Sequence, residues 1–368
     1  MSRAELARLT TLSHQALALI LNELVELGVV VEVSTRGAQR GPGRPALQYE
    51  YDPTRVCVVS LYIGLRYAEV SLCDGVGHPI ADNVELTPGW DVDEVVSQAS
   101  ATISGLIASA GVGDRPCTVG VVVHGWVNEA AGSVTSDGMG WRDVPIVTLL
   151  EEAVAAEVTV LEASRAAAIA EYREGAAGGA RRATVFNLGP EMTATQVIDG
   201  RPDTGASGSA GVVGRCPVPF QGEVLTIDEL IGSVAARRRY NELTDEPVEW
   251  MADVYARARA GDRHAQSVVA VQIEGLAFAS AWLIAAADPD RFVLTGAIGD
   301  YSEAAKATLH AAILDRLDPR LGDRCPIRFS TLARQAWIRG GVHGALEHQR
   351  SGERMATAEP VATGEPAG

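Results

Sequence analysis

The chain has 368 residues, of which 47% are hydrophobic and 21% are charged, and its formal net charge is −16 at pH 7. That length accommodates two or three domains with a sizeable core. Five scattered cysteines without a C-x-x-C pair indicate reduced thiols and argue against disulfides or bound zinc. The longest apolar stretch, residues 276–287, is too short for a bilayer, and no secretory leader opens the chain. The sequence therefore predicts a cytoplasmic protein without a membrane segment.

The negative charge is unevenly distributed along the chain. A net charge of −16 argues against a nucleic-acid partner for the molecule as a whole. Residues 1–50, however, hold five arginines and five glutamates, so this segment is neutral and the remainder carries the whole deficit. We therefore expect the acidic body to be repelled by DNA, so that only the N-terminal segment can bind it.

The N-terminal segment has the pattern of two short helices followed by a hairpin. Ser2 and Glu5 have the spacing of a capping box, and Ser13 is placed to cap a second helix that ends at Gly28. Residues 29–33 and 47–51 have strand composition, and a loop rich in glycine and arginine separates them. Helix, turn, helix and hairpin together predict a winged helix-turn-helix, which is a DNA-binding motif. The alternative is a helical hairpin that only packs on the body.

Polar groups for DNA contact are few in this segment. Gln15 can read adenine with two hydrogen bonds, and the Gly-Arg-Pro loop at residues 43–45 suits a narrow minor groove. The second helix otherwise offers alanine and leucine, so we expect modest sequence specificity. The predicted DNA-binding residues are Ser13, His14, Gln15, Asn22, Arg36, Arg40 and Arg44.

Two strand–glycine–strand units recur after the linker at residues 52–54. Gly64 precedes Asp74-Gly75 by the same spacing that separates Gly189 from Asp199-Gly200. This repeat predicts two related α/β lobes. Between them, a buried strand at residues 118–123 leads into His124-Gly125, and a β-branched run at 158–161 leads into an alanine-rich helix.

Residues 158–216 resemble the ROK family of repressors, open reading frames and sugar kinases. Members of the family show V-E-N-D-A-N-A-A-A-L-A-E and later G-x-A-G-E-I-G-H, and ROK repressors begin with S-R-A-E-L-A-R-x-T-G-L-S and carry G-R-P further on. The matching residues here are Val160, Ala166 to Ala168, Ala170-Glu171, Gly189, Asp199-Gly200, Ala210-Gly211, Gly214, Ser2 to Ser13 and Gly43-Arg44-Pro45.

The resemblance implies the architecture of the chain. Residues 1–53 would form a winged helix-turn-helix whose first helix is missing. Residues 54–348 would form a two-lobed, actin-like and ribonuclease-H-like sugar kinase fold. Residues 349–368 are polar and rich in proline and glycine, and we expect a disordered tail there.

The residues that carry kinase chemistry in the family are changed here. Glu162 and Ala163 stand where the family has its sugar-binding Asn and catalytic Asp, and Val212 and Arg215 stand where it has a sugar-binding Glu and a zinc-ligating His. Tyr62 replaces the aspartate of one phosphate turn, and residues 190–192 spoil the other. Of the cysteine cluster only Cys216 remains. The resemblance therefore predicts a kinase fold without kinase activity, zinc or cofactor, with residues 214–225 ordered instead around Phe220 and Val224.

A small-molecule effector would bind near the altered positions. The candidate ligand-binding residues are His124, Gly125, Asp137, Glu162 and Arg215. Arg215 can pair with an anionic group on a ligand, or it can form an internal salt bridge to Glu162 or Glu191. A lone histidine after a strand, such as His124, is more often structural than ligand-binding.

The sequence thus predicts a DNA-binding transcriptional regulator of ROK type, a repressor, with a kinase-like body for effector sensing and oligomerisation. Its predicted partners are a double-stranded operator, a sugar derivative or anionic metabolite, and further copies of itself in a homodimer or homotetramer. Two alternatives remain: a sugar kinase with an attached DNA-binding segment, and a scaffold that binds protein partners but no DNA.

Overall fold

The computed structural model describes residues 1–10, 12–26, 28–34, 47–87, 89–113, 115, 117–206 and 208–356. The chain divides into two compact units. Unit 1 contains residues 1–121, 145–159 and those from 345 onward, and unit 2 contains residues 122–144 and 160–344. Each unit is described by itself below.

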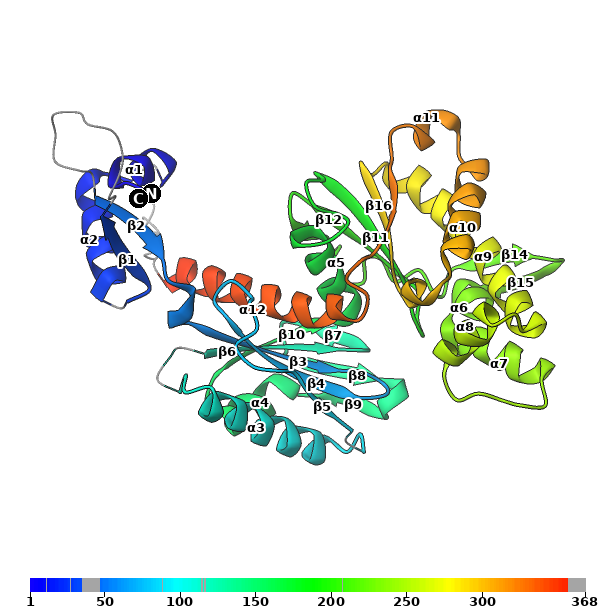
Figure 1. The fold of residues 1–368 in the computed structure, drawn as a ribbon, viewed down its shortest axis with the longest axis horizontal. Coiled ribbons are helices and arrows are strands. Elements are labelled where there is room, and N and C mark those ends of the chain that lie inside the picture. The colour runs from blue at the N-terminus through cyan, green and yellow to red at the C-terminus, as the bar shows by residue number, and fades with distance from the viewer. Residues whose placement is uncertain are drawn as a thin grey trace, which may run out of the picture. The chain divides into compact units, whose positions relative to one another are not determined.

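The N-terminal elements of unit 1 follow the predicted order of two helices and a hairpin (Figure 1). They are α1 (Arg3–Thr10), α2 (His14–Glu26), β1 (Val30–Ser34) and β2 (Leu47–Tyr51). Ser2 and Glu5 make the reciprocal bonds of the capping box, and the Ser13 hydroxyl accepts from the Ala16 N–H at 3.2 Å. Leu17, Leu21 and Tyr49 form a small core, so both helices pack against the antiparallel β1–β2 pair.

The remainder of unit 1 is built on a five-stranded sheet in the order β10-β6-β3-β4-β5. The strands are β3 (Cys57–Ile63), β4 (Ala68–Asp74), β5 (Val84–Leu86), β6 (Cys117–Val123) and β10 (Glu157–Glu162). The helices α3 (Val92–Ser109) and α4 (Ile146–Val154) lie on one face of this sheet (Figure 1). Every residue of β3 is buried, as expected for a central strand covered on both faces.

Unit 2 contains a second five-stranded sheet, in the order β13-β12-β11-β16-β17. Its strands are β11 (Arg182–Leu188), β12 (Thr193–Ile198), β13 (Arg201–Pro202), β16 (Arg291–Gly296) and β17 (Ile327–Phe329). Successive side chains of a strand point to opposite faces, so Phe186 and Phe292 pack with the core that includes α9 (Arg263–Ala287), whereas Val185 and Val293 pack against α5 (Ala163–Arg173). The sheet is thus a middle layer between α5 and α9.

The other elements of unit 2 surround this sandwich. A three-stranded antiparallel sheet comprises β7 (Trp126–Asn128), β8 (Ser133–Ser136) and β9 (Trp141–Val144), and a hairpin comprises β14 (Pro217–Phe220) and β15 (Glu223–Thr226). The remaining helices are α6 (Ile227–Ile231), α7 (Ser233–Leu243), α8 (Met251–Arg259), α10 (Glu303–Arg316) and α11 (Pro319–Gly322).

The long helices α9 and α12 (Gln335–Ala356) both extend beyond the segments that the sequence analysis described, which were the apolar stretch at residues 276–287 and the chain before residue 349. Among the described residues, α9 alone is long and apolar enough to cross a membrane, with a mean hydropathy of 1.8 in its most apolar window, but 61% of that window is buried in the structure. It is therefore a core helix. The disordered tail was expected at residues 349–368, but α12 continues to Ala356, so residues 349–356 are helical. No proline interrupts this part of the sequence. Residues 357–368 lie outside the described residues.

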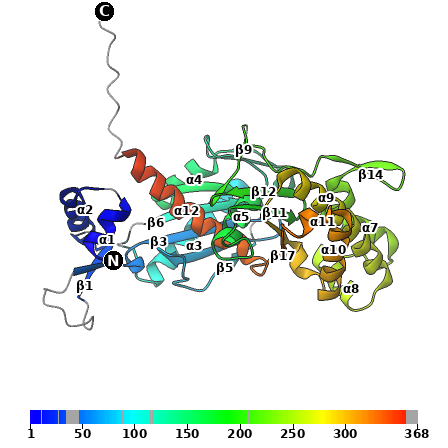
Figure 2. The same cartoon turned by 90° about the horizontal axis from the view of Figure 1, so that it is seen from above.

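The predicted internal repeat is confirmed by the strand pairing. β3 and β4 form an antiparallel pair around Gly64, and β11 and β12 form one around Gly189. α5 also packs against α12 on one side, where Gly340 faces it, and Gly344 faces Leu161 of β10 (Figures 1 and 2). A Cβ atom on Gly340 would lie 1.9 Å from the carbonyl oxygen of Ala166, so the two helix backbones touch.

Candidate ligand-binding site

The first part of the site is the junction at which β10 leads directly into α5. Glu162 is the N-cap of this helix, and its carboxylate accepts from the Ser164 N–H at 2.9 Å, from the Arg165 N–H at 3.2 Å and from the Ser164 hydroxyl. Burial raises the pKa of Glu162, while these hydrogen bonds lower it. A helix N-terminus is where an anionic ligand would bind, so the protein's own carboxylate occupies that place. Ala163, fully buried beside it, supplies no functional group.

A buried arginine, which the sequence analysis did not identify, follows one turn along α5. Arg165 is only 8% exposed, and its Nη1 lies 2.6 Å from the Glu129 Oε1 in the turn between β7 and β8. Its Nη2 donates to the carbonyl oxygen of Gly208. Gly208 has φ +77°, a conformation that favours glycine, so the local backbone fixes where that carbonyl points. Arg165 thus holds two loops against the start of α5.

The second part of the site is the turn between β11 and β12. The Asp228 carboxylate accepts from the Met192 N–H at 2.7 Å, and the Asp228 N–H donates to the Gly214 carbonyl at 2.8 Å. Burial raises the pKa of both Asp228 and Glu191, and the Asp228 charge raises that of Glu191 further. A phosphate at this turn would meet two carboxylates and would lack the Met192 N–H as a donor. The turn is therefore unsuited to phosphate.

Arg215 lies close to the same carboxylates. Its positive charge lowers the pKa of Glu191 and of Asp228, which places it in their electrostatic neighbourhood. Glu162 was the other expected partner of Arg215, but its carboxylate caps α5. Asp137 raises the pKa of Glu191 and forms an exposed ion pair with Arg142 at 3.1 Å. Of the candidate ligand-binding residues, Arg215 and Asp137 therefore both influence the pKa of Glu191, whereas Glu162 caps α5.

His124 and Gly125 make packing contacts with neighbouring residues. The His124 ring meets Trp337 edge to face, with ring centroids 5.5 Å apart, and burial lowers the pKa of His124 to about 4. The imidazole is therefore neutral at pH 7. A Cβ atom on Gly125 would lie 2.5 Å from the Thr135 carbonyl oxygen, and the φ of +145° disfavours other residues, so glycine is needed for the close approach to β8. These contacts agree with the structural interpretation of His124.

The structure also places Tyr62, which is an altered position, and Val224, which was expected to order residues 214–225. The Tyr62 side chain is buried and lies over Gly64, since a Cβ atom there would be 2.4 Å from the tyrosine hydroxyl. The expectation that Val224 orders residues 214–225 is wrong, because Val224 is 73% exposed on the β14–β15 hairpin. Phe220 is partly buried against the core, and Asp228 holds the start of the segment through Gly214. Within the described residues, no three His, Cys, Asp or Glu side chains are grouped so that they could hold a metal ion.

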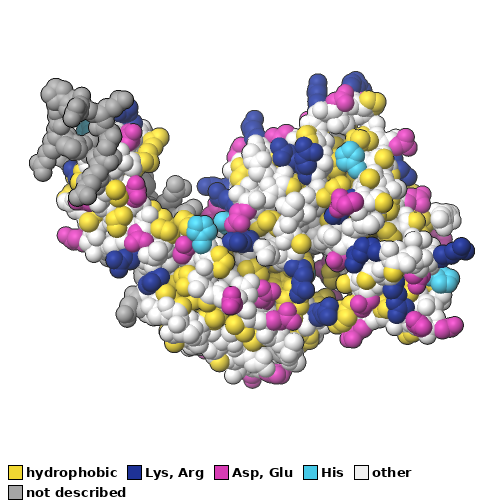
Figure 3. Space-filling model, viewed as in Figure 1, with side chains coloured by type: hydrophobic (Ala, Val, Ile, Leu, Met, Phe, Trp, Pro, Cys, Tyr) yellow, Lys and Arg dark blue, Asp and Glu magenta, His cyan; other side chains and the backbone are white. Residues whose placement is uncertain are grey.

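The predicted DNA-contacting residues fall into two groups. Ser13, His14, Gln15 and Asn22 are all exposed at or along α2. The same helix exposes Glu23, Glu26 and Leu19, the last to 72%, and contains no Lys or Arg. Arg36, Arg40 and Arg44 lie outside the described residues. On the face drawn in Figure 3, acidic side chains are interspersed with basic ones over the described surface.

Comparison with known proteins identifies the family. The model of the ROK family matches residues 58–347, and the chain therefore belongs to the ROK family. The chain is 23% identical to a xylose repressor of Caldicellulosiruptor bescii over 61% of this chain and 56% of that protein. It is 25% identical to a glucokinase of Halalkalibacterium halodurans over 64% of this chain and 78% of that enzyme. The chain thus spans little more than half of the repressor that it matches.

A solved structure extends the likeness to most of the chain. A ROK family transcriptional regulator, a homologue of the E. coli Mlc protein, superposes with a TM-score of 0.78 at 21% identity. The superposition covers 94% of this chain and 92% of that protein. This likeness establishes a mixed α/β, ROK sugar-kinase-like fold.

Proposed function

We propose that this protein is a cytoplasmic, DNA-binding transcriptional regulator of ROK type, a repressor, whose kinase-like body no longer phosphorylates sugars. The observation that carries the proposal is the use of internal carboxylates at both places where a kinase would bind its substrates. Glu162 caps α5, and Asp228 accepts from the Met192 N–H. Ala163 offers no base for a sugar hydroxyl.

The loss of kinase activity is tested directly. General-base removal alone lowers a rate by about 10²–10⁴-fold. We expect no ATP-dependent turnover of glucose, N-acetylglucosamine or N-acetylmannosamine above a blank without protein. Measurable turnover that is abolished by Glu162→Gln would contradict the proposal, because Glu162 would then have replaced the missing base.

DNA binding is proposed for α1, α2 and the β1–β2 hairpin, which together have the order of a winged helix-turn-helix. Exposed carboxylates at Glu23 and Glu26 repel phosphates, so α2 by itself is a poor groove-binding helix. We infer that the arginines between β1 and β2, above all Arg44, supply most of the affinity.

Fluorescence anisotropy with the chain's own upstream DNA tests this assignment. We expect Arg44→Ala to weaken binding more than Gln15→Ala and to lower the salt slope by about one. Glu23→Gln is the matched variant on α2, and removal of its charge should strengthen binding. Wild-type affinity for Arg44→Ala would show that the loop is not the anchor.

A scaffold function is the second candidate, and the exposed Leu19 beside two glutamates on α2 favours it. Such a surface is typical of a protein-binding helix more than of one that lies in a DNA groove. The same anisotropy experiment separates the two functions, because a scaffold would bind upstream DNA and unrelated DNA equally weakly.

Two further partners belong to the proposal. Paired half-sites require two N-terminal segments in one assembly, so we infer a homodimer or homotetramer. Effector sensing is assigned to unit 2, and an anionic effector is favoured over a neutral hexose, because Ala163 and Val212 cannot hydrogen-bond sugar hydroxyls through their side chains. Thermal-shift comparison of neutral sugars with their anionic derivatives tests the class, and stabilisation by neutral sugars alone would refute it.

A further inference from the structure

The guanidinium of Arg165 is the one described cation in unit 2 that is nine-tenths buried and has a carboxylate within direct hydrogen-bond distance. It lies at the start of α5, bonded to the Glu129 Oε1 at 2.6 Å and to the Gly208 carbonyl. The side chain of Arg165 is 10% exposed, whereas that of Glu129 is 44% exposed. The cation is therefore fixed inside the protein, and its anionic partner reaches it from the surface.

The two bonds of Arg165 differ in how readily they can be replaced. The bond to Gly208 involves a backbone carbonyl whose direction is set by the loop. The bond to Glu129 involves a side chain from the turn between β7 and β8, and this half-exposed carboxylate can return to water when another carboxylate takes its place on the guanidinium. A planar guanidinium has five N–H donors, and their fork geometry matches a carboxylate.

We propose that Arg165 is a binding site for the carboxylate of a small organic acid, which replaces Glu129 on the guanidinium. The group that occupies this position in the structure is itself a carboxylate, which defines the chemistry that fits. Replacement of one carboxylate by another also keeps the local charge balance, in which Arg165 lowers the pKa of the neighbouring Glu162. A neutral ligand that displaced Glu129 would leave the buried cation without an anionic partner, at a high cost in desolvation.

The site does not extend to Arg215, the other candidate cation of the region. Arg215 is exposed and lies in the neighbourhood of Glu191 and Asp228, whose charges would repel the acid. The organic acid therefore binds to Arg165 and not to Arg215. Its role as an effector rests on the proposed function, whereas its binding does not.

Isothermal titration of the full-length chain tests the site with D-glucuronate and D-gluconate as carboxylates, glucose 6-phosphate as a phosphate, and glucose as a neutral sugar. We expect saturable binding of at least one of the two acids. Glu129→Gln removes the competing carboxylate and should tighten that binding about tenfold, whereas Arg165→Gln should abolish it. Arg142→Gln, which removes an exposed arginine of β9, is the matched control and should bind as the wild type does.

The opposite signs expected for Glu129→Gln and Arg165→Gln distinguish a site from a structural ion pair. If Arg165→Gln fails to fold, Glu129→Gln still decides, because Glu129 is half exposed. No saturable binding of either acid by wild type or Glu129→Gln would overturn the proposal, as would equal binding of glucose. Binding of glucose 6-phosphate alone would overturn the carboxylate class. DNA binding measured without any acid tests the proposed function separately.

Discussion

Asp228 and Glu162 each satisfy backbone N–H groups that a phosphate or a substrate oxygen would otherwise require. Glu162 is held locally as the N-cap of α5, whereas Asp228 lies at the start of α6, where its backbone bonds to Gly214 and its carboxylate to the distant Met192 N–H. A ligand that competed for these donors would have to displace a group tethered to the same chain. At the scale of single residues, carboxylates of unit 2 itself satisfy these N–H donors.

Asp228→Asn should stabilise the protein at neutral pH. Burial raises the folded-state pKa of Asp228, so its contribution to stability is lost as pH rises through that pKa. Asparagine keeps an acceptor for the Met192 N–H and removes the charge. A gain of about 1 kcal/mol would raise Tm by about 2–4 °C, and the gain should vanish in acid.

Calorimetry at several pH values checks this, with Glu229→Gln as the control of opposite sign. Backbone hydrogen bonding to Thr226 lowers the pKa of Glu229, so its charged form stabilises the fold above its ordinary pKa. Glu229→Gln should therefore lower Tm at neutral pH. A decrease in Tm for Asp228→Asn at neutral pH would show that its charge is needed.

His124→Phe should make the stability of the protein less sensitive to mild acid. Burial lowers the folded-state pKa of His124 to about 4 from an unfolded value of 6.5, so stability is present above 6.5 and is lost as pH falls towards 4. Phenylalanine keeps the edge-to-face packing on Trp337 and cannot take up a proton. The decrease in Tm between pH 7 and pH 5 should be smaller in this variant, and an equal decrease would mean that folding does not lower the pKa of His124.

At the scale of elements, α5 and α12 pack closely on each other. Ala167, Ala170 and Ala336 form a small core there, and Gly340 lets the α12 backbone reach Ala166. Alanines on α5 and Gly340 on α12 let the two helix backbones approach closely. The position of the Glu162 cap and of Arg165 at the start of α5 depends on this packing.

Gly340→Ala should be strongly destabilising although it improves intrinsic helix propensity by about 1 kcal/mol. Its Cβ would lie 1.9 Å from the Ala166 oxygen, and separation of the two backbones should cost about 3 kcal/mol or more. Gly105→Ala on α3 is the matched control, because a Cβ there meets nothing within 4 Å, and it should be neutral or stabilising. Chemical denaturation of both variants decides, and a Gly340→Ala protein as stable as wild type would contradict the contact.

The sequence predicted the elements that have a strong local pattern and missed those defined by distant contacts. The capping box at Ser2, the end of α2 at Gly28 and the two hairpins around Gly64 and Gly189 are confirmed, because capping and turn geometry depend on neighbouring residues. Arg165 gave no signal, because its partners are 36 and 43 residues away. The same limit explains Val224, whose apolar side chain was assigned to a core that it does not reach.

At the scale of the whole molecule, association of two copies must overcome a net charge of −16 on each chain. Between Glu274 and Asp288, α9 carries no charged residue, and it exposes Phe278 to 46% and Trp282 to 56% on one side. Exposed apolar side chains one turn apart without nearby charge on the same helix are suited to contact with an identical surface.

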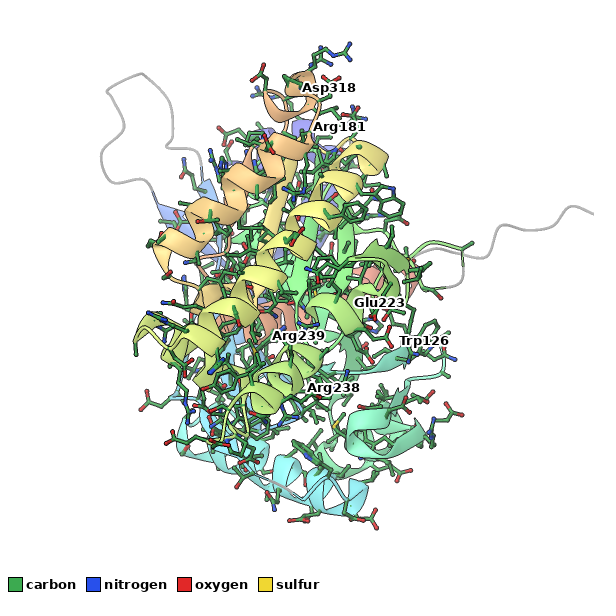
Figure 4. All side chains as sticks on the ribbon, turned by 90° about the vertical axis from the view of Figure 1, so that its right-hand side faces the viewer. Trp126, Arg181, Glu223, Arg238, Arg239 and Asp318 are labelled. Carbon is green, nitrogen blue, oxygen red and sulfur yellow. The ribbon has the colours of Figure 1, made fainter. Side chains whose placement is uncertain are left out.

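We therefore expect the double variant Phe278→Ser and Trp282→Ser to shift the chain from dimer or tetramer towards monomer in sedimentation velocity. Trp126→Ser is the matched control, because Trp126 is also exposed but lies on β7, away from α9 (Figure 4). The double variant should also lose affinity for paired half-sites by about 10²-fold or more, as effective concentration is lost. Unchanged association of the double variant would place the interface elsewhere.

The glycines of α12 also have a consequence for the order in which the chain folds. Four glycines at positions 340, 341, 344 and 352 each cost about 1 kcal/mol in a helix interior, so this segment is a poor helix when it is isolated. It becomes helical only when the surface of α5 is available for docking. Because α12 follows α5 by a long stretch of chain, α5 waits without its cover until α12 has been synthesised. During that interval the alanine face of α5 is open to chaperones and proteases, and a chain that stops before Gly340 would keep it open permanently.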